Sequence, residues 1–305
     1  MYDVVIIGGG PAGLTAGLYA GRGGMKALII EKMFTGGQAA TTYEIDNYPG
    51  FDQTISGPDL VMKMEAHAKK FGTELVYEDV VDIELDGTVK LIKTTSNVYQ
   101  AKAVILSMGA NPKELGLEKE KKLRGAGVSY CATCDGAFFR DKVTAVVGGG
   151  DTAVEDALFL SRFCPKVYLI HRRGELRAVK VLQDAIMAND KIEFLWNSAV
   201  EDILGEDAVE GIMVKDIKTG QTQKVKVEGL FIAVGNVPNS EIIKGKVETN
   251  AGGYIITDES MLTNKFGVFA VGDVREKTLR QVVTAAADGA IAAYAAERYI
   301  SENRW

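Results

Sequence analysis

The chain contains, twice, an apolar run that is followed at once by a glycine-rich loop, and this repeat constrains the fold more than any other feature. Residues 4–7 precede Gly8-Gly9-Gly10-Pro11-Ala12-Gly13, and residues 143–147 precede Gly148-Gly149-Gly150-Asp151-Thr152-Ala153. Each loop is followed by a predicted helix. An unbroken apolar run is typical of a parallel strand that is buried on both faces. A loop with this glycine spacing lets backbone N–H groups and the positive end of a helix approach a pyrophosphate. The sequence therefore predicts an α/β protein with two dinucleotide-binding units.

The two units differ at the residue that ends their second strand. Glu31 lies 23 residues after the first glycine of its loop, and His171 lies 23 residues after the first glycine of the other. A carboxylate at this position accepts hydrogen bonds from a ribose hydroxyl but repels a 2′-phosphate, whereas arginines bind that phosphate. His171 is followed by Arg172, Arg173 and Arg177. We therefore expect an unphosphorylated dinucleotide at the first loop and NADP(H) at the second. The alternative for Arg172 and Arg173 is a solvated surface pair.

A Cys-x-x-Cys pair lies just before the second glycine loop. Cys131 and Cys134 are two of the three cysteines of the chain, and Asp135 follows them directly. This spacing allows a small-ring disulfide and is typical of reversible two-electron exchange. Two alternatives stay open, half of a zinc site and a buried structural pair, although a zinc site lacks further ligands at suitable spacing. The third cysteine, Cys164, has no partner at useful spacing and is interpreted as a packing residue.

The remaining pattern indicates further elements of an α/β fold. Strands are predicted over residues 27–30, 103–109, 229–234 and 266–273, helices over residues 58–71 and 284–300, and a β-hairpin within residues 75–93 that turns at Asp86-Gly87. About ten residues after Pro112 are rich in Lys and Glu and are predicted to form a linker and a surface helix. The last helix is rich in alanine, which allows close packing.

Both units end in the same strand-and-turn pattern, and this sets the predicted domain boundaries. Residues 109–112 close the first unit, and residues 235–238 close the second with the same Gly-x-x-Pro ending. The last strand and helix are expected to rejoin the first unit. Residues 1–112 and 241–305 are therefore predicted to form one discontinuous domain. Residues 113–240 form the second domain, which carries the Cys-x-x-Cys pair.

The charge and the apolar pattern limit the classes of partner. A net charge of −6 argues against nucleic acid or an anionic membrane surface as the main partner. No stretch is long enough to span a bilayer, and the first residues lack the features of a signal peptide. Three cysteines in a chain of 305 residues fit a reducing compartment. We expect a cytoplasmic protein with no nucleic-acid, membrane or metal partner.

Together these motifs resemble the bacterial-type, low-molecular-weight thioredoxin reductases over essentially the whole length. The marks of the resemblance are the two glycine loops, the sequence Cys131-Ala132-Thr133-Cys134-Asp135, the run from His171 to Arg177, the pair Gly272-Asp273 and the pair Arg280-Gln281. The family implies two Rossmann-like domains of the three-layer ββα type, the second inserted into the first. It also implies a homodimer.

The resemblance assigns site residues to two cofactors. For FAD it implies contacts along the first glycine loop, at the flavin and at the ribityl chain, from Gly8, Gly10, Ala12, Gly13, Glu31, Gly36, Gly37, Gln38, Asn47, Asp273, Arg280, Gln281 and Val282. For NADPH the implied contacts come from Gly148, Gly150, Asp151, Thr152, Ala153, His171, Arg172, Arg173, Arg177 and Gly235. The implied catalytic residues are Cys131, Cys134 and Asp135.

The family's reaction is the reduction of thioredoxin by NADPH. The resemblance implies that electrons pass from NADPH through FAD to the Cys131–Cys134 disulfide and then to thioredoxin, with a domain rotation between the half-reactions. It places Cys134 towards the flavin and makes Cys131 the thiol that attacks the partner. Asp135 is expected to move the proton of the exchange, and a helix that starts near the thiols would favour a thiolate.

Other functions remain compatible with these motifs. A ferredoxin-dependent relative would be expected to lack an intact second nucleotide loop. A flavin thiol oxidase would consume oxygen without added disulfide protein. A redox-sensing flavoprotein would bind NADPH but show no sustained turnover with any disulfide substrate.

Overall fold

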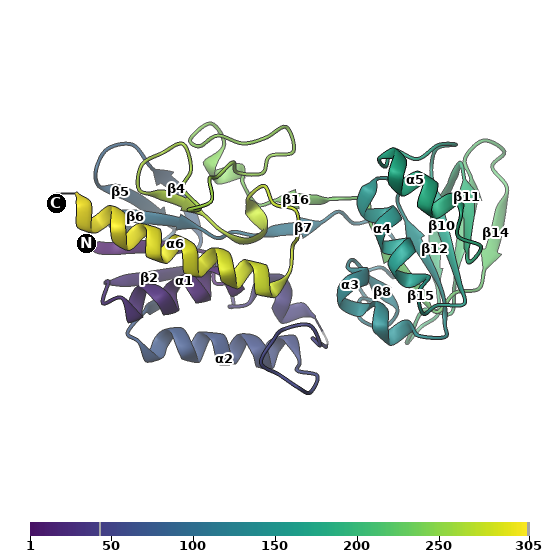
Figure 1. Cartoon of the computed structure of the whole chain (residues 1–305), viewed down its shortest axis with the longest axis horizontal. Helices are drawn as coiled ribbons and strands as arrows, with labels where there is room; N and C mark the ends of the chain where they lie inside the picture. The colour runs from purple at the N-terminus through teal and green to yellow at the C-terminus, as the bar shows by residue number, and fades with distance from the viewer. Residues whose placement is uncertain (43, 304–305) are drawn as a thin grey trace. The chain divides into compact units, whose positions relative to one another are not determined.

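The computed structural model describes residues 1–42 and 44–303 and divides the chain into two compact units. Unit 1 is made of Met1–Asn111 and of the chain from Val237 onward, and unit 2 is Pro112–Asn236. The chain passes between them twice, through β7 (Ala110–Pro112) and β16 (Asn236–Pro238), which pair with each other as a two-stranded sheet (Figure 1). In the described residues, no helix combines the length and the apolar character that crossing a membrane requires.

Unit 1 is built on a mixed seven-stranded sheet. Its order is β3-β2-β1-β6-β5-β4, and β17 pairs with β6. The pairings among β1, β2, β3, β6 and β17 are parallel, whereas β4, β5 and the first part of β6 form an antiparallel meander. The strands are β1 (Tyr2–Ile7), β2 (Ala27–Glu31), β3 (Glu74–Tyr77), β4 (Val80–Glu84), β5 (Lys90–Thr94), β6 (Val98–Leu106) and β17 (Val268–Ala270). The helices are α1 (Pro11–Arg22), α2 (Gly57–Lys70), α6 (Val282–Glu302) and the short η1 (Gly37–Thr41), η3 (Glu241–Ile243) and η4 (Gly272–Val274).

The two faces of this sheet are covered by different layers, because side chains alternate along a strand. Val4 and Ile6 pack in one cluster with residues of α1 and α6. Val5 and Ile7 point the other way and pack in a second cluster with Ile83 of β4 and residues of β5. All four β1 residues are nearly inaccessible to solvent, which explains why the strand reads as an unbroken apolar run.

The small residues of α6 bring this helix against α1. A Cβ atom built on Gly289 would lie 2.2 Å from the carbonyl oxygen of Ala12. No side chain larger than hydrogen fits there, so the alanine-rich helix does pack closely, as its composition allows. Figure 1 shows α6 running alongside α1.

Unit 2 repeats the three-layer plan. Its parallel sheet has the order β11-β10-β9-β15-β8, and a separate antiparallel sheet has the order β12-β13-β14. Val146 and Leu169 pack with α4, whereas Val147 and Ile170 pack with the antiparallel sheet. The elements are β8 (Val128–Ser129), α3 (Ala132–Asp135), η2 (Gly136–Phe139), β9 (Val143–Val147), α4 (Asp151–Leu160), β10 (Lys166–His171), α5 (Lys180–Met187), β11 (Ile192–Trp196), β12 (Ser198–Leu204), β13 (Gly211–Asp216), β14 (Thr222–Val225) and β15 (Gly229–Ile232).

One predicted element is wrong. The surface helix expected after Pro112 is absent, and this stretch forms turns before β8. The cause is Glu120, which is 1% exposed. Its carboxylate accepts hydrogen bonds from the backbone N–H groups of Leu115, Gly116 and Leu117 at 2.9, 2.8 and 3.1 Å. The chain therefore wraps around a carboxylate instead of pairing its N–H groups along a helix.

Candidate functional site

The first glycine loop is closely packed at Gly8 and Gly13 but faces open space at Gly10. Gly8 has φ +104°, and a Cβ atom on it would lie 2.4 Å from the carbonyl oxygen of Ser107. A Cβ atom on Gly13 would lie 1.9 Å from the carbonyl oxygen of Gly8. A Cβ atom on Gly10, by contrast, would meet no atom within 4 Å. Because Gly10 is the N-cap of α1 and Pro11 opens the helix, the free side of the loop presents backbone N–H groups at a helix N-terminus, which suits a pyrophosphate.

Glu31 lies beside this loop at the end of β2. Its carboxylate accepts hydrogen bonds from the backbone N–H groups of Gly9 and Lys32, both at 2.7 Å. These contacts fix the carboxylate next to the position that a ribose would occupy if a pyrophosphate lay on the loop.

Several residues carried over by resemblance lie in segments that hydrogen bonds hold together. The N–H of Gly36 donates to the carbonyl oxygen of Gly9 at 2.8 Å, which holds the start of η1, including Gln38, beside the loop. Asn47 Nδ2 donates to Gln281 Oε1 at 3.0 Å. Gln281 is the N-cap of α6, so this bond joins two segments that are far apart in the sequence.

Asp273 and Arg280 are half-buried polar groups of the same unit. Burial raises the pKa of the Asp273 carboxyl, and the positive charges of Lys277 and Arg280 oppose this shift. The Arg280 guanidinium lies 4.4 Å from the ring centroid of Tyr254. Its Nε is buried without a hydrogen-bond partner among the described residues. A buried donor of this kind fits a site completed by a polar ligand such as FAD.

The second glycine loop has the same construction in unit 2. A Cβ atom on Gly148 would lie 2.5 Å from Cβ of Ala153, whereas one on Gly150, the N-cap of α4, would meet open space. Asp151 accepts a hydrogen bond from the Val179 N–H at 2.7 Å, and the neighbouring Thr152 is exposed. Gly235, at the end of this unit, has φ +105° and also faces open space.

The histidine and the arginines that follow β10 differ in environment. His171 is 4% exposed, and its ring lies beneath Gly149, since a Cβ atom there would be 2.3 Å from it. Burial lowers the pKa of the His171 imidazole, and the nearby charges of Arg177 and Arg173 lower it further. Arg172, Arg173 and Arg177 are exposed. The N–H of Arg177 donates to the Gly149 carbonyl at 2.7 Å, so the arginine segment is fastened to the loop.

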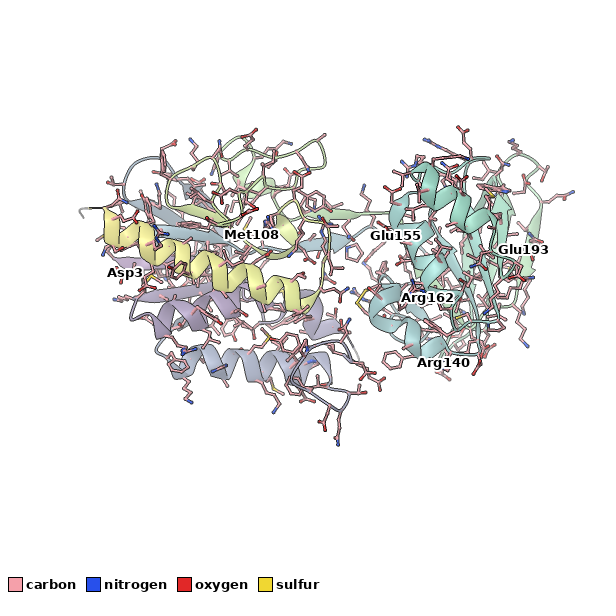
Figure 2. All side chains as sticks on the ribbon, in the orientation of Figure 1. Asp3, Met108, Arg140, Glu155, Arg162 and Glu193 are labelled. Carbon is pink, nitrogen blue, oxygen red and sulfur yellow. A yellow bond between two sulfur atoms is a disulfide. The ribbon has the colours of Figure 1, made fainter. Side chains whose placement is uncertain are left out.

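The two thiols of the Cys-x-x-Cys pair form a disulfide. The Cα atoms of Cys131 and Cys134 are 5.3 Å apart, and Cys131 is the N-cap of the short α3. Figure 2 shows the bond between their sulfur atoms at the start of this helix. Both residues are half-buried. This geometry and exposure fit a partly accessible, redox-active disulfide. The described residues also contain no group of three or more metal-ligating side chains.

Ser129 connects the disulfide to the neighbouring acid. Its hydroxyl donates to Asp135 Oδ2 at 2.6 Å and accepts from the N–H of Cys131 at 3.1 Å. Burial raises the pKa of Asp135, while the bond from Ser129 and the charge of Arg124 oppose this shift. A carboxyl whose pKa is raised beside a disulfide can hold and return a proton.

Two further residues, Ser129 and the buried Asp288 that contacts the Gly272 turn, carry no motif that would identify them from the sequence. Serine two residues before a Cys-x-x-Cys pair is a weak signal, and Asp288 lies in a helix whose composition suggests only packing. In both cases the role depends on tertiary contacts.

Comparisons with known proteins agree with this arrangement. A family model described as pyridine nucleotide-disulphide oxidoreductase matches residues 2–289. The thioredoxin reductases of Peptoclostridium acidaminophilum and Bacillus subtilis are 50% and 47% identical to the chain, covering 99% of it and 98% and 96% of their own lengths. The solved thioredoxin reductase of Streptococcus pyogenes is 48% identical, with a TM-score of 0.94 and 99% of each chain covered. That of Lactococcus lactis, in the FR conformation, is 44% identical, with a TM-score of 0.69 and 99% and 100% covered. The chain therefore belongs to the pyridine nucleotide-disulphide oxidoreductase family, among the thioredoxin reductases.

Proposed function

We propose that this oxidoreductase transfers two electrons from NADPH, through FAD, to the Cys131–Cys134 disulfide and from there to the disulfide of a thioredoxin. The observation that carries the proposal is the partly accessible disulfide at the start of α3, in the unit that also holds the second glycine loop. Family membership and the names of the relatives support the same reaction.

Unit 1 would hold FAD. The free side of the first glycine loop would take the pyrophosphate, Glu31 a ribose, and Asp273 and Arg280 the parts of the cofactor nearer the flavin. When bound, FAD supplies a hydride acceptor that returns two electrons to a disulfide.

Unit 2 would hold NADPH. The open side of Gly150 offers backbone N–H groups to the pyrophosphate, and the exposed Arg172, Arg173 and Arg177 suit the 2′-phosphate. The buried His171 supports the loop from below. It would act through packing, because its ring is buried beneath Gly149.

The exchange with thioredoxin follows from the two thiols and Asp135. Two electrons and two protons convert the disulfide to Cys131 and Cys134 thiols. Loss of a proton makes Cys131 a thiolate, which attacks one sulfur of the thioredoxin disulfide and releases the other as a thiolate. Cys134 then attacks the mixed bond, re-forms the disulfide and releases the second thioredoxin thiol. Asp135, fixed by Ser129, would carry protons between these groups.

We further propose that the two units change their mutual orientation during turnover, as the family resemblance implies. Relatives of nearly equal identity to this chain, 48% and 44%, superpose on it with TM-scores of 0.94 and 0.69. Those two relatives therefore differ from each other by more than sequence divergence explains. The two chain segments that cross between the units, β7 and β16, pair with each other as a short sheet. Such a narrow connection can act as a hinge.

We propose a cytoplasmic homodimer, and unit 1 has a surface that suits a second copy of the chain. Tyr19 of α1 and Ile291 and Tyr294 of α6 are 46%, 40% and 62% exposed, beside a pocket lined by α1, α2 and α6.

Tyr294→Glu should convert the dimer to a monomer in analytical ultracentrifugation, because a buried charge disfavours an apolar interface. Val181→Glu is the control, because Val181 is 78% exposed but lies in unit 2, outside this surface, and it should leave the dimer intact. A Tyr294→Glu protein that stays dimeric would place the interface elsewhere.

The proposed reaction is tested by separating its halves. Cys131→Ser and Cys134→Ser should each abolish NADPH oxidation that depends on thioredoxin, because neither variant can form the disulfide. Both should retain FAD and should still oxidise NADPH with an artificial flavin oxidant. Cys164→Ser is the control, since Cys164 is buried and lies outside the pair. Thioredoxin reduction by either single variant at the native rate would refute the mechanism, and rapid oxygen consumption without thioredoxin would favour a thiol oxidase.

A further inference from the structure

A buried charge cluster lies under the Gly272–Asp273 turn. Asp288 Oδ2, on α6, accepts hydrogen bonds from the Gly272 N–H at 3.0 Å and from Lys277 Nζ at 2.7 Å. Arg275 Nη1 lies 3.5 Å from the same oxygen. The side chains of Asp288, Lys277 and Arg275 are only 9%, 7% and 14% exposed. Buried charges are costly, so a cluster of three at one turn calls for a function.

The cluster lies directly behind the first glycine loop. Gly272 has φ +70°, and a Cβ atom on it would lie 3.0 Å from Cβ of Ala12. Gly289, the residue after Asp288, packs closely against the Ala12 backbone. The turn, α6 and the first turn of α1 therefore meet at one point, and Asp288 joins the first two.

The charges of the cluster do not balance within it. One carboxylate faces two cations, and the next carboxylate is that of Asp273. The pKa of Asp273 is raised by burial, opposed by Lys277 and Arg280, and raised a little further by Asp288. The first turn of α1 contributes no acidic side chain at this point. Lys277 pairs with Asp288 at 2.7 Å, and its charge, like that of Arg280, also acts on the Asp273 carboxyl.

We propose that Asp288 and Lys277 are positioning residues of the FAD site, Asp288 by fixing the Gly272–Asp273 turn and Lys277 by keeping Asp273 a charged acceptor for cofactor hydroxyls. This inference rests on the proposed function, because it requires FAD in unit 1. An ionised carboxylate accepts a hydrogen bond more strongly than a neutral one. FAD affinity should therefore fall as Asp273 is protonated.

The two residues should shift the pH dependence of FAD binding in opposite directions. Lys277→Met removes a positive charge beside Asp273, so FAD binding should weaken at a higher pH than in the native protein. Asp288→Asn keeps an acceptor for the Gly272 N–H but removes a negative charge, so the weakening should move to a lower pH. The dissociation constant should rise roughly fivefold on protonation, the difference between a charge-assisted and a neutral hydrogen bond.

The experiment measures the dissociation constant of FAD for the apoprotein by flavin fluorescence, from the ordinary Asp pKa of about 4 upward, because burial raises the pKa of Asp273. Lys277→Met combined with Asp288→Asn removes one charge of each sign and should return the midpoint towards the native value. This double variant also covers the case in which Asp288→Asn alone fails to fold. Lys102→Met is the control, since Lys102 pairs with Asp3 at 2.7 Å in the same unit, and it should not move the midpoint.

The outcomes separate this inference from the proposed function. A native protein that binds no FAD at any pH would refute the function itself. Native binding with an equal loss of affinity at every pH in Lys277→Met would show a merely structural role and overturn the inference. A shift of the same sign in both single variants would overturn it as well.

Discussion

At the scale of single residues, Asp156 is an ionisable group that the proposed reaction does not use. It lies on α4, is 9% exposed, and its carboxyl makes no hydrogen bond or ion pair within residues 1–42 and 44–303. Burial raises its pKa to about 7, with a smaller contribution from the negative charge of Glu155. A carboxyl with a raised pKa in the folded state binds its proton more tightly there than in the unfolded chain. It therefore stabilises the fold fully below its ordinary pKa, and this contribution is lost as the pH rises through about 7.

Asp156→Asn should consequently stabilise the protein at alkaline pH but not at acid pH. Asparagine keeps the shape of the protonated acid and cannot ionise. The gain in unfolding free energy at about pH 8 should be on the order of 2–4 kcal/mol and should vanish near about pH 4. Chemical denaturation at both values measures it. Glu155→Gln, at the exposed neighbouring position, is the control and should change stability by about 0.5 kcal/mol or less. An equal effect of Asp156→Asn at both pH values would show that Asp156 does not titrate as inferred.

At the scale of elements, local pattern was enough to predict the strand, loop and helix of each nucleotide unit. The runs at residues 4–7 and 143–147 are most of β1 and all of β9, and the glycine loops lead into α1 and α4. The hairpin turn at Asp86-Gly87 is confirmed between the antiparallel β4 and β5. These features depend on periodicity and on glycine, both of which can be read over a few residues.

What the sequence could not predict depends on contacts between distant residues. The helix expected after Pro112 is replaced by turns around the buried Glu120, a burial that its charge gives no reason to expect. Asp288 acquires its role from Gly272, sixteen residues away. His171 has the spacing of a ligand, but its ring is buried beneath Gly149. Pattern alone does not distinguish a side chain that faces a ligand from one that supports the loop that does.

The segment after β10 should determine the choice between NADPH and NADH. Arg172→Ala with Arg173→Ala should lower the ratio of kcat/KM for NADPH to that for NADH by about a hundredfold or more, since each charge-assisted contact contributes about 1.5–3 kcal/mol. Arg162→Ala is the control, because Arg162 lies in the same unit but stacks on Phe159 at 5.5 Å. It should leave the ratio unchanged. Equal use of both nucleotides by the native protein would contradict the assignment.

At the scale of the whole molecule, each unit contains a complete core. The two large hydrophobic clusters of unit 1 contain residues from both of its chain segments, whereas the two hydrophobic clusters of unit 2 contain residues of Pro112–Asn236 alone. Each central sheet is also covered on both faces by elements of its own unit. The requirement for folding, burial of a sheet on both faces, is thus met twice and independently.

Unit 2 should therefore fold when it is made alone as residues 112–236. It should unfold cooperatively, form the Cys131–Cys134 disulfide and show the same pH-dependent gain from Asp156→Asn as the whole chain, because both cysteines, Ser129 and α4 belong to it. Residues 150–236 are the control and should not fold, since they lack β8 and β9 of the sheet.

Unit 1 should tolerate the replacement of the excised segment by a short glycine-rich turn, because β7 and β16 pair side by side, and it should still bind FAD. Calorimetry and flavin fluorescence measure these outcomes. If residues 112–236 stay unfolded while the whole chain is stable, the core of unit 2 requires contacts from unit 1, and the two units are not independent folding domains.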